Sequence, residues 1–499
     1  MPTANLTMLT DFYELTMMQG YFANGIADKL GVFDLFYRQN PFGNGFAVMA
    51  GLEQVIEYVN NLRFDKADVD YLSGLGQFDA AFLDYLRDFR FTGDIHAMPE
   101  GEIVFPFEPL VRVTAPIIQA QLLETALLNI INHQCLIATK AARICYAAGG
   151  DAVLEFGLRR AQGPDAGVLG ARAGVIGGCD ATSNVLAGQL FDVPVRGTHA
   201  HSWVMSFPSE LEAFRAYART FPDACLLLVD TYDSLGSGVP NAITVFGEMR
   251  RKAAESGAAF KNFGIRLDSG DIAYLSKEAR KMLDGAGFQD AIISASGDLD
   301  EFLIRDLKLQ GAAVTVWGIG TRLITAYDCP ALGGVYKLAA ESGVKTGGGA
   351  NELTPKIKIS NNPQKITNPG VKKVMRLYEK STGKIKADLI TLDHEEIDEN
   401  ADLTIFDPNA TWRRMTLKAG RFYHRPLLRP IFIGGAQVYE SPPLRDIAAY
   451  FQAALGTLWD EHKRIVNPHV IPVDLSDALW ELKRVMIDEI QRSKRIQKI

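Results

Sequence analysis

Between about residues 150 and 320, short apolar runs alternate with longer stretches in which apolar residues recur at helical spacing. The runs are rich in β-branched and other apolar side chains, a pattern typical of parallel strands buried on both faces. Strands that alternate with helices predict right-handed βαβ units. The expected strands are 152–156, 174–178, 193–197, 225–230, 263–267, 291–296 and 314–318.

The stretches between these runs predict helices, at 158–173, 182–190, 209–219, 239–256, 272–286 and 299–309. Seven strands in this order favour a barrel of the (β/α)₈ kind, complete or incomplete. An open, doubly wound sheet is the alternative. Outside this centre the pattern predicts strands at 111–117, 371–378 and 384–391, one long helix or two at 119–148, a loop at 351–371 and a final helix at 476–499.

Composition places the chain among ordinary globular proteins. Its 499 residues correspond to roughly three domains, or two if one is a barrel. An apolar fraction of 47% and a charged fraction of 22% exclude disorder of the whole chain. The net charge of −7 argues against a general nucleic-acid binder.

Several signals of export and membrane insertion are missing from the sequence. No stretch offers the ~18 apolar residues that a membrane helix needs. Asp11 and Glu14 interrupt the apolar N-terminus, which also lacks the basic region of a secretory signal. The five cysteines are scattered without a CxxC pair, against a disulfide framework or a cysteine-rich zinc site. We therefore expect a cytoplasmic protein with neither a membrane nor nucleic acid as partner.

Each predicted strand of the centre switches from apolar to polar residues where it ends. In a barrel of parallel strands, reactive groups collect on the loops after these carboxyl ends. Loops are polar in any case, so a purely solvating role remains the alternative. The polar strand ends are 155–160, 180–184, 197–203, 230–234, 266–271, 296–298 and 318–322.

The chemistry of these strand ends suits a phosphorylated sugar and its metal. Arg159 and Arg266 offer planar donor forks to phosphate oxygens, and the glycine-rich turns at 296–298 and 318–321 allow backbone N–H groups to approach an anion. Carboxylates that could accept ribose hydroxyls or hold Mg²⁺ are Asp230, Asp268 and Asp298. Ion pairing across the rim is the structural alternative, and the direct metal ligands stay open.

Two histidines fall in one strand-end motif, GTHAHSW at 197–203. His199 and His201 lack a nearby third ligand for zinc. At the rim, the His201 imidazole suits a general base or nucleophile, with a purely structural role as the alternative.

Seven motifs together resemble the nicotinate phosphoribosyltransferase family. They run in order from about residue 9 to about residue 380: LTDFYELTMMQGYF at 9–22, EFGLRRAQGPDAG at 155–167, GTHAHSW at 197–203, VDTYDS at 229–234, GIRLDSGD at 264–271, SGDLDE at 296–301 and GIGTRL at 318–323. The resemblance implies an irregular α/β barrel, here 136–340, joined to an α/β sandwich domain formed from both ends of the chain, 1–135 and 341–499.

The same resemblance implies an activity and its partners. Nicotinate and 5-phosphoribosyl 1-diphosphate would give nicotinate mononucleotide and diphosphate, with Mg²⁺ and with coupled hydrolysis of ATP, as a ligase of NAD salvage. It also implies a homodimer in which Tyr13 crosses to the partner's active site. Tyr13 and Phe156 would sandwich the pyridine ring, and ATP would phosphorylate His201.

The remaining site residues are also assigned by resemblance. Arg159 and Arg266 would contact the phosphoribosyl substrate or the nicotinate carboxylate, and Asp268 would be a ribose-linked or metal-linked acid. His201, Arg266 and Asp268 are the expected catalytic residues. The other expected substrate-binding residues are Ser183, Thr198, Ser202, Asp230, Gly297, Asp298, Gly318, Gly320 and Thr321.

Ser183 bears on the choice of pyridine. The related nicotinamide enzyme carries an acid at this place, and a carboxylate would repel an acidic substrate, whereas a serine hydroxyl can donate to it. This favours nicotinate. A nicotinamide or quinolinate phosphoribosyltransferase, or a non-catalytic nucleotide-binding relative, are the alternatives.

Overall fold

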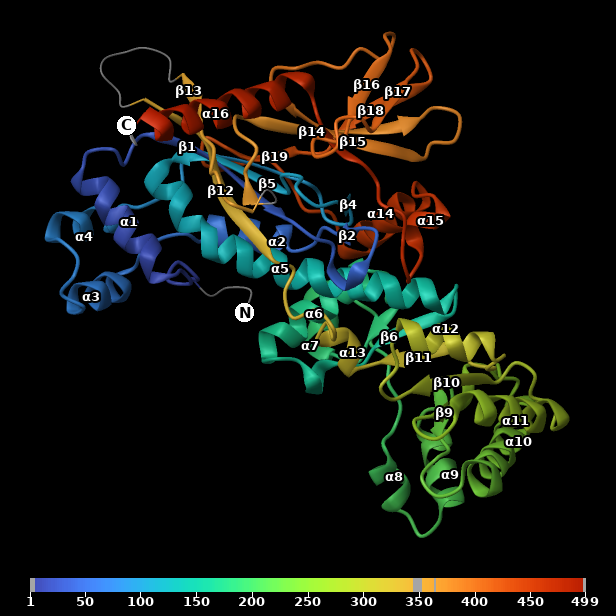
Figure 1. The fold of residues 1–499 in the computed structure, drawn as a ribbon. Helices are drawn as coiled ribbons and strands as arrows, with labels where there is room; N and C mark the ends of the chain where they lie inside the picture. The colour runs from blue at the N-terminus through green and yellow to red at the C-terminus, as the bar shows by residue number, and fades with distance from the viewer. Residues whose placement is uncertain (1–4, 344–351, 363–364, 497–499) are drawn as a thin grey trace. The chain divides into compact units, whose positions relative to one another are not determined.

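The computed structural model describes residues 5–343, 352–362 and 365–496 of the chain (Figure 1). It contains two compact units. The central unit is Ile137–Pro330, and the terminal unit comprises the described parts of Met1–Leu136 and Ala331–Ile499. The predicted helix at 119–148 is a single one, α5 (Ile117–Ala148), which begins in the terminal unit and ends in the central unit.

The central unit is built on one parallel sheet of six strands, in the order β7-β6-β11-β10-β9-β8. This half-barrel sheet confirms the predicted α/β class. The strands are β6 (Ala152–Glu155), β7 (Ala181–Thr182), β8 (Cys225–Leu228), β9 (Phe263–Leu267), β10 (Ile292–Ser296) and β11 (Val316–Ile319).

Most helices of the central unit lie where the apolar periodicity places them. Side-chain caps start several of them: Ser209, Asp271 and Asp300 each accept a hydrogen bond from a backbone N–H of the first turn. Their apolar faces pack on the sheet, and the core between them holds aromatic rings such as Phe246 of a helix and Trp317 of a strand. The helices are α6 (Pro164–Ile176), α7 (Val185–Phe191), α8 (His201–Met205), α9 (Glu210–Thr220), α10 (Val239–Ser256), α11 (Ile272–Gly285), α12 (Glu301–Leu309) and α13 (Thr321–Ile324).

The predicted strand at 174–178 is wrong, because these residues form the end of α6 and the two glycines after it. The end of α6 packs so closely on α5 that a methyl group on Gly177 would lie 2.2 Å from the carbonyl oxygen of Ala138. A buried helix end made of small and apolar residues has the composition of a buried strand, so periodicity does not separate them.

Two further predictions in this unit need correction. The segment 193–197 is not a strand, since only Val195 forms a bridge, to Thr182. The helix expected at 158–173 begins only at Pro164, after the 3₁₀ turn Leu158–Arg160. A glycine at φ +108° before Pro164 interrupts the helical backbone, and proline favours the first turn of a helix.

The terminal unit holds mostly antiparallel sheets, with one parallel pair, β15 with β21. A seven-stranded sheet has the order β13-β12-β1-β5-β3-β19-β20, and a four-stranded sheet has the order β18-β14-β15-β21. Both ends of the chain contribute to the larger sheet: β1 pairs with β12, and the Phe33 ring stacks on Tyr336 at 4.8 Å. The strands are β1 (Leu30–Tyr37), β3 (Asp94–Ala97), β5 (Val111–Pro116), β12 (Gly334–Ser342), β13 (Leu353–Pro355), β14 (Lys372–Glu379), β15 (Ile385–Leu392), β18 (Phe422–Pro426), β19 (Arg429–Ile433), β20 (Ala436–Gln437) and β21 (Val473–Leu475).

Several sequence predictions concern this unit. The strand at 111–117 and the strand pair at 371–378 and 384–391 are confirmed as β5, β14 and β15. The expected loop at 351–371 instead contains β13, paired with β12. The final helix is α16 (Asp477–Ile496), and residues 497–499 lie outside the described chain. Across the described ranges, no helix combines the length and apolarity required to span a membrane.

Candidate functional site

A pocket of about 530 Å³ lies at the carboxyl ends of the central strands. Most of the predicted site residues line it; His201, Asp230, Ser202 and Tyr13 do not. The lining residues are Phe156, Leu158, Arg159, Arg160, Ser183, Gly197, Thr198, His199, Ala200, Arg266, Asp268, Ser296, Gly297, Asp298, Gly318, Gly320 and Thr321.

Phe156 follows β6 and forms an aromatic wall of this pocket. Its N–H donates to the carbonyl of Ile319 at 2.7 Å. The buried Glu155 fixes the turn on either side, because its carboxylate accepts from the Gly157 N–H and, at 2.6 Å, from the Thr182 hydroxyl. Burial raises the pKa of Glu155. Sequence reasoning assigned Glu155 no role, although an acid ending an apolar run was the available signal.

Ser183 lies in the wall of the same pocket, after β7. Its backbone N–H donates to the Glu155 carbonyl at 2.9 Å. Its hydroxyl has no hydrogen-bond partner among the described residues. A free hydroxyl in this position is able to donate to a carboxylate ligand.

Arg266 supplies a half-buried cation to the pocket. Its Nη2 donates to the His199 carbonyl at 3.3 Å, and its buried Nε has no partner in the described chain. Burial lowers the pKa of Arg266, while Asp268 and Asp230 act in the opposite direction. An unsatisfied buried donor on a guanidinium suits an anion. The exposed Arg159 lines the same pocket and adds a second positive charge.

The acids beside Arg266 form one hydrogen-bonded chain with His201. The buried Asp230 carboxylate accepts from the Asp268 N–H at 3.1 Å and from the Ser269 hydroxyl at 2.6 Å. Its other oxygen lies 3.3 Å from His201 Nε2. His201 therefore does not line the pocket, but Asp230 connects it to Asp268, which does. The Ser296 hydroxyl donates to Asp268, an interaction that sequence reasoning did not foresee.

Gly297 has a positive φ of +95°, a backbone conformation that costs energy for residues other than glycine. A methyl group there would lie 2.7 Å from the Asp268 carbonyl oxygen. The glycine therefore lets two strand-end loops approach each other at the pocket.

Two predicted site residues lie elsewhere. Ser202 is exposed on α8 and does not line the pocket. Tyr13 belongs to the terminal unit, on α1 (Phe12–Ala23), where 45% of it is exposed.

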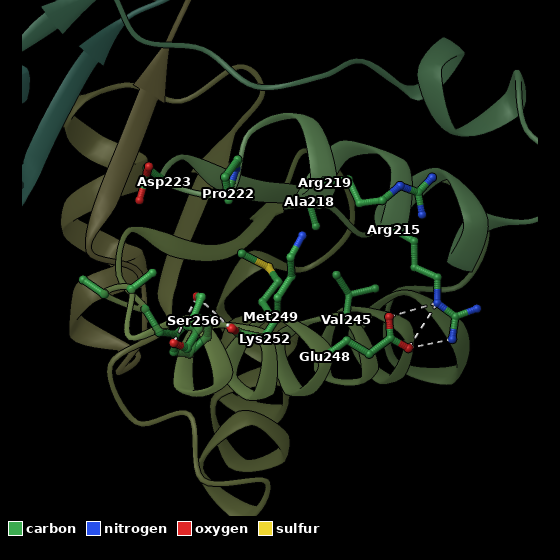
Figure 2. A pocket seen from close by; sticks show the side chains of 14 residues that line it. Arg215, Ala218, Arg219, Pro222, Asp223, Val245, Glu248, Met249, Lys252 and Ser256 are labelled. Carbon is green, nitrogen blue, oxygen red and sulfur yellow. Dashed lines mark hydrogen bonds and ion pairs between the residues drawn. The ribbon is translucent and has the colours of Figure 1, made fainter.

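A different pocket, of about 400 Å³, lies between α9 and α10 (Figure 2). Its charged rim is partly neutralised, because Arg215 pairs with Glu248 through Nε and Nη2, the shorter contact being 2.6 Å. No predicted site residue lines it. The chemistry expected from the sequence is thus concentrated at the strand ends.

Comparison with known proteins agrees with this geometry. Three family models match the chain: the nicotinate phosphoribosyltransferase N-terminal domain at residues 8–132, the family model at 152–382 and the C-terminal domain at 371–483. The chain belongs to the nicotinate phosphoribosyltransferase family. The motif resemblance in the sequence is thereby confirmed.

Members of the nicotinate phosphoribosyltransferase family from distant organisms align over nearly all of the chain. The nicotinate phosphoribosyltransferase of Bacillus subtilis (strain 168) is 49% identical over 487 residues, covering 98% of this chain and 96% of its own. The crystal structure of human nicotinic acid phosphoribosyltransferase matches with a TM-score of 0.80 at 32% identity, covering 96% of this chain and 99% of its own.

Proposed function

We propose that this protein joins nicotinate to 5-phosphoribosyl 1-diphosphate in the pocket at the strand ends, with ATP hydrolysis coupled through His201. Family membership supports the transferase activity. The observation that carries the assignment of the site is Arg266, a half-buried guanidinium whose buried Nε has no partner among the described residues. It lies in one pocket with Phe156, Ser183 and the strand-end glycines.

The reaction needs positioning and charge stabilisation more than proton transfer. Diphosphate leaves C1 of the ribose through a transition state of oxocarbenium character, and the pyridine nitrogen attacks the opposite face. That nitrogen carries no proton, so no general base is required. Arg266 and Arg159 would hold the charged phosphoribosyl group, while Phe156 would stack on the pyridine ring.

Phosphorylation of His201 would couple ATP to this transfer. With Nε2–H donating to Asp230, the ring keeps its lone pair on Nδ1. Nδ1 would attack the γ-phosphorus of ATP, the bond to the β-phosphate oxygen would break, and ADP would leave. The new charge beside the Asp230–Asp268 chain would alter how the pocket binds substrate, and hydrolysis of phosphohistidine would reset it.

The residues present fit magnesium as a partner of the diphosphate. Among the described residues no cluster of three His, Cys, Asp or Glu side chains forms a metal cage. Magnesium commonly keeps several waters and binds one or two carboxylates together with substrate phosphates. Asp298, exposed at the pocket, and Asp268 are the carboxylates that would face it. When bound, the ion would neutralise charge on the leaving diphosphate.

A homodimer would complete the pyridine site. Tyr13 is half exposed on α1, as is Phe12 beside it, with 46% of the residue exposed. Rings exposed in this way are common where a second subunit binds. In the proposed dimer, the partner's Tyr13 would cover the face of the pyridine ring that Phe156 leaves open. The cytoplasmic location remains a prediction.

The test is one assay with two products. Purified protein with nicotinate, phosphoribosyl diphosphate, Mg²⁺ and ATP is expected to form nicotinate mononucleotide together with ADP. His201→Ala should lose nicotinate-dependent ADP formation and retain slow transfer. His394→Ala, an exposed histidine of the terminal unit, is the matched control. Unchanged ADP coupling in His201→Ala would refute the role of His201, and absence of any transfer would refute the function.

Competing pyridines in the same assay address the alternatives. Because the free Ser183 hydroxyl can donate to one carboxylate, nicotinate should be used in preference to nicotinamide and to the diacid quinolinate. Ser183→Asp should weaken the binding of nicotinate, because the new carboxylate would repel that of the substrate. A preference for nicotinamide in the unmodified protein would overturn this assignment, and nucleotide binding without turnover would favour the non-catalytic relative.

A further inference from the structure

The parallel sheet of the central unit leaves two edge strands, β7 and β8. An extended segment between α7 and α8 follows the β7 edge. There the Thr182 N–H donates to the Pro194 carbonyl at 3.1 Å, and the Arg196 N–H donates to the Thr182 carbonyl at 2.9 Å. This is the backbone ladder of a single parallel bridge. After Arg196 the ladder stops, although the segment continues to α8.

At the β8 edge a side chain makes the contact instead. The Leu228 N–H donates to His199 Nε2 at 3.2 Å. Leu228 is the last residue of β8, and its N–H faces the edge away from β9. The segment 194–199 therefore contacts both edges of the sheet, through backbone at β7 and through the imidazole at β8.

The His199 imidazole is built into this place. The residue is 7% exposed, and its ring lies edge-on to Tyr217 at 4.7 Å and near Phe214 at 6.1 Å. Because Nε2 accepts a hydrogen bond, the ring proton belongs on Nδ1, which lies 3.4 Å from the Ala200 carbonyl. Burial lowers the pKa of His199 to about 4, so the ring is neutral at physiological pH.

The same residue touches both halves of the proposed site. The His199 carbonyl accepts from Arg266 Nη2 at 3.3 Å. Two residues later His201 begins α8 and faces Asp230. A movement of His199 away from β8 would therefore withdraw a partner from Arg266 and shift His201 from Asp230 together.

We propose that His199 is a positioning residue. Its imidazole closes the half-barrel at the β8 edge in place of a backbone ladder, and it thereby keeps Arg266 at the pocket and His201 beside Asp230. The inference rests on the proposed function for the roles of Arg266 and His201. The closure itself does not depend on those roles, so it can be measured separately.

Matched variants of one residue separate the hydrogen bond from the packing. His199→Phe keeps a ring against Tyr217 and Phe214 but cannot accept from the Leu228 N–H. His199→Gln replaces the ring by a chain whose amide oxygen can reach the position of Nε2. His199→Asn is too short to reach Leu228 and does not crowd the site, so it serves if the phenylalanine variant fails to fold.

Hydrogen exchange and steady-state kinetics are the two readouts. In His199→Phe, exchange in the peptide containing Leu228 should accelerate, KM for phosphoribosyl diphosphate should rise about tenfold, and ADP formed per nicotinate mononucleotide should depart from the wild-type ratio. KM for nicotinate should change little. His199→Gln should recover most of each effect.

Three results would overturn the proposal. One is unchanged exchange at Leu228 in both His199→Phe and His199→Asn. Another is a lower unfolding temperature of the variants with wild-type KM and wild-type ADP ratio, which a purely structural residue would give. The third is a glutamine variant as defective as phenylalanine. If the wild-type protein makes no product, the proposed function fails, and the exchange result alone then decides the closure.

Discussion

Gly318→Ala is the substitution that tests the aromatic wall most directly. Gly318 lies in β11, beneath the ring of Phe156. A methyl group on its Cα would lie 2.7 Å from Cδ2 and 2.8 Å from Cε2 of that ring. Carbon atoms in contact normally stay about 3.5–4.0 Å apart. The new methyl has little room to retreat, because it would also lie 3.3 Å from Cβ of Ser296.

The ring of Phe156 must therefore move by about 1 Å or rotate. An aromatic pair in good geometry contributes about 0.5–1.5 kcal/mol beyond its buried area. Losing that much from stacking on the pyridine corresponds to a rise in KM for nicotinate of about twofold to tenfold. The backbone N–H and C=O of residue 318 remain in the sheet, so KM for phosphoribosyl diphosphate should stay close to the wild-type value.

The assay varies nicotinate at saturating phosphoribosyl diphosphate, and a double-mutant cycle with Phe156→Ala supplies the control. Without the ring there is nothing for the methyl to displace, so Gly318→Ala should cost little in the Phe156→Ala background. An equal effect in both backgrounds would refute the reasoning. A change confined to KM for phosphoribosyl diphosphate would instead place Gly318 against the phosphoribosyl group.

Two other predictions concern stability. Glu301→Gln should lower the free energy of unfolding by about 3–5 kcal/mol, measured in urea titrations. The buried Glu301 carboxylate lies 2.7 Å from Lys140 and 2.8 Å from Arg143, and an amide is a weaker partner for these two cations. A loss below about 1 kcal/mol would contradict this. Burial raises the pKa of Glu14 from 4.5 to about 7, so the native state holds a proton that the unfolded chain releases. As the pH rises from 4.5 to 7, Glu14 should therefore lower the free energy of unfolding by about 3 kcal/mol. Urea titrations at several pH values should show a smaller pH dependence of this free energy in Glu14→Gln.

Local signals explain which parts of the fold were predictable. The helices α9 to α12 combine an apolar face with a capping residue or a start directly after a strand loop, and their predicted bounds differ from the observed ones by at most a few residues. The strands β8 to β11 are short and largely apolar, with Arg266 in β9 and two serines in β10 as their polar residues, and they have the expected length. In both cases a single stretch of sequence holds the whole signal.

The strand-end chemistry was predictable for a similar reason. A parallel sheet brings all carboxyl ends to one edge, so residues that follow different strands meet without further information. The pairs inside the site follow less directly from the sequence. The contact of Asp230 with the Asp268 N–H, and that of Ser296 with Asp268, depend on the stagger of β8, β9 and β10, which composition does not encode.

The segment 193–199 shows the limit most clearly. Its apolar and β-branched residues read as a strand, and it does lie along a sheet edge, yet only one residue of it forms a bridge. What holds its far end is a side chain, His199, whose acceptor replaces the next backbone carbonyl. A hydrophobic pattern reports which residues avoid water, not whether a neighbouring N–H is satisfied by backbone or by imidazole. In our proposal the half-barrel is therefore closed by a residue that a search for catalytic histidines would pass over in favour of His201.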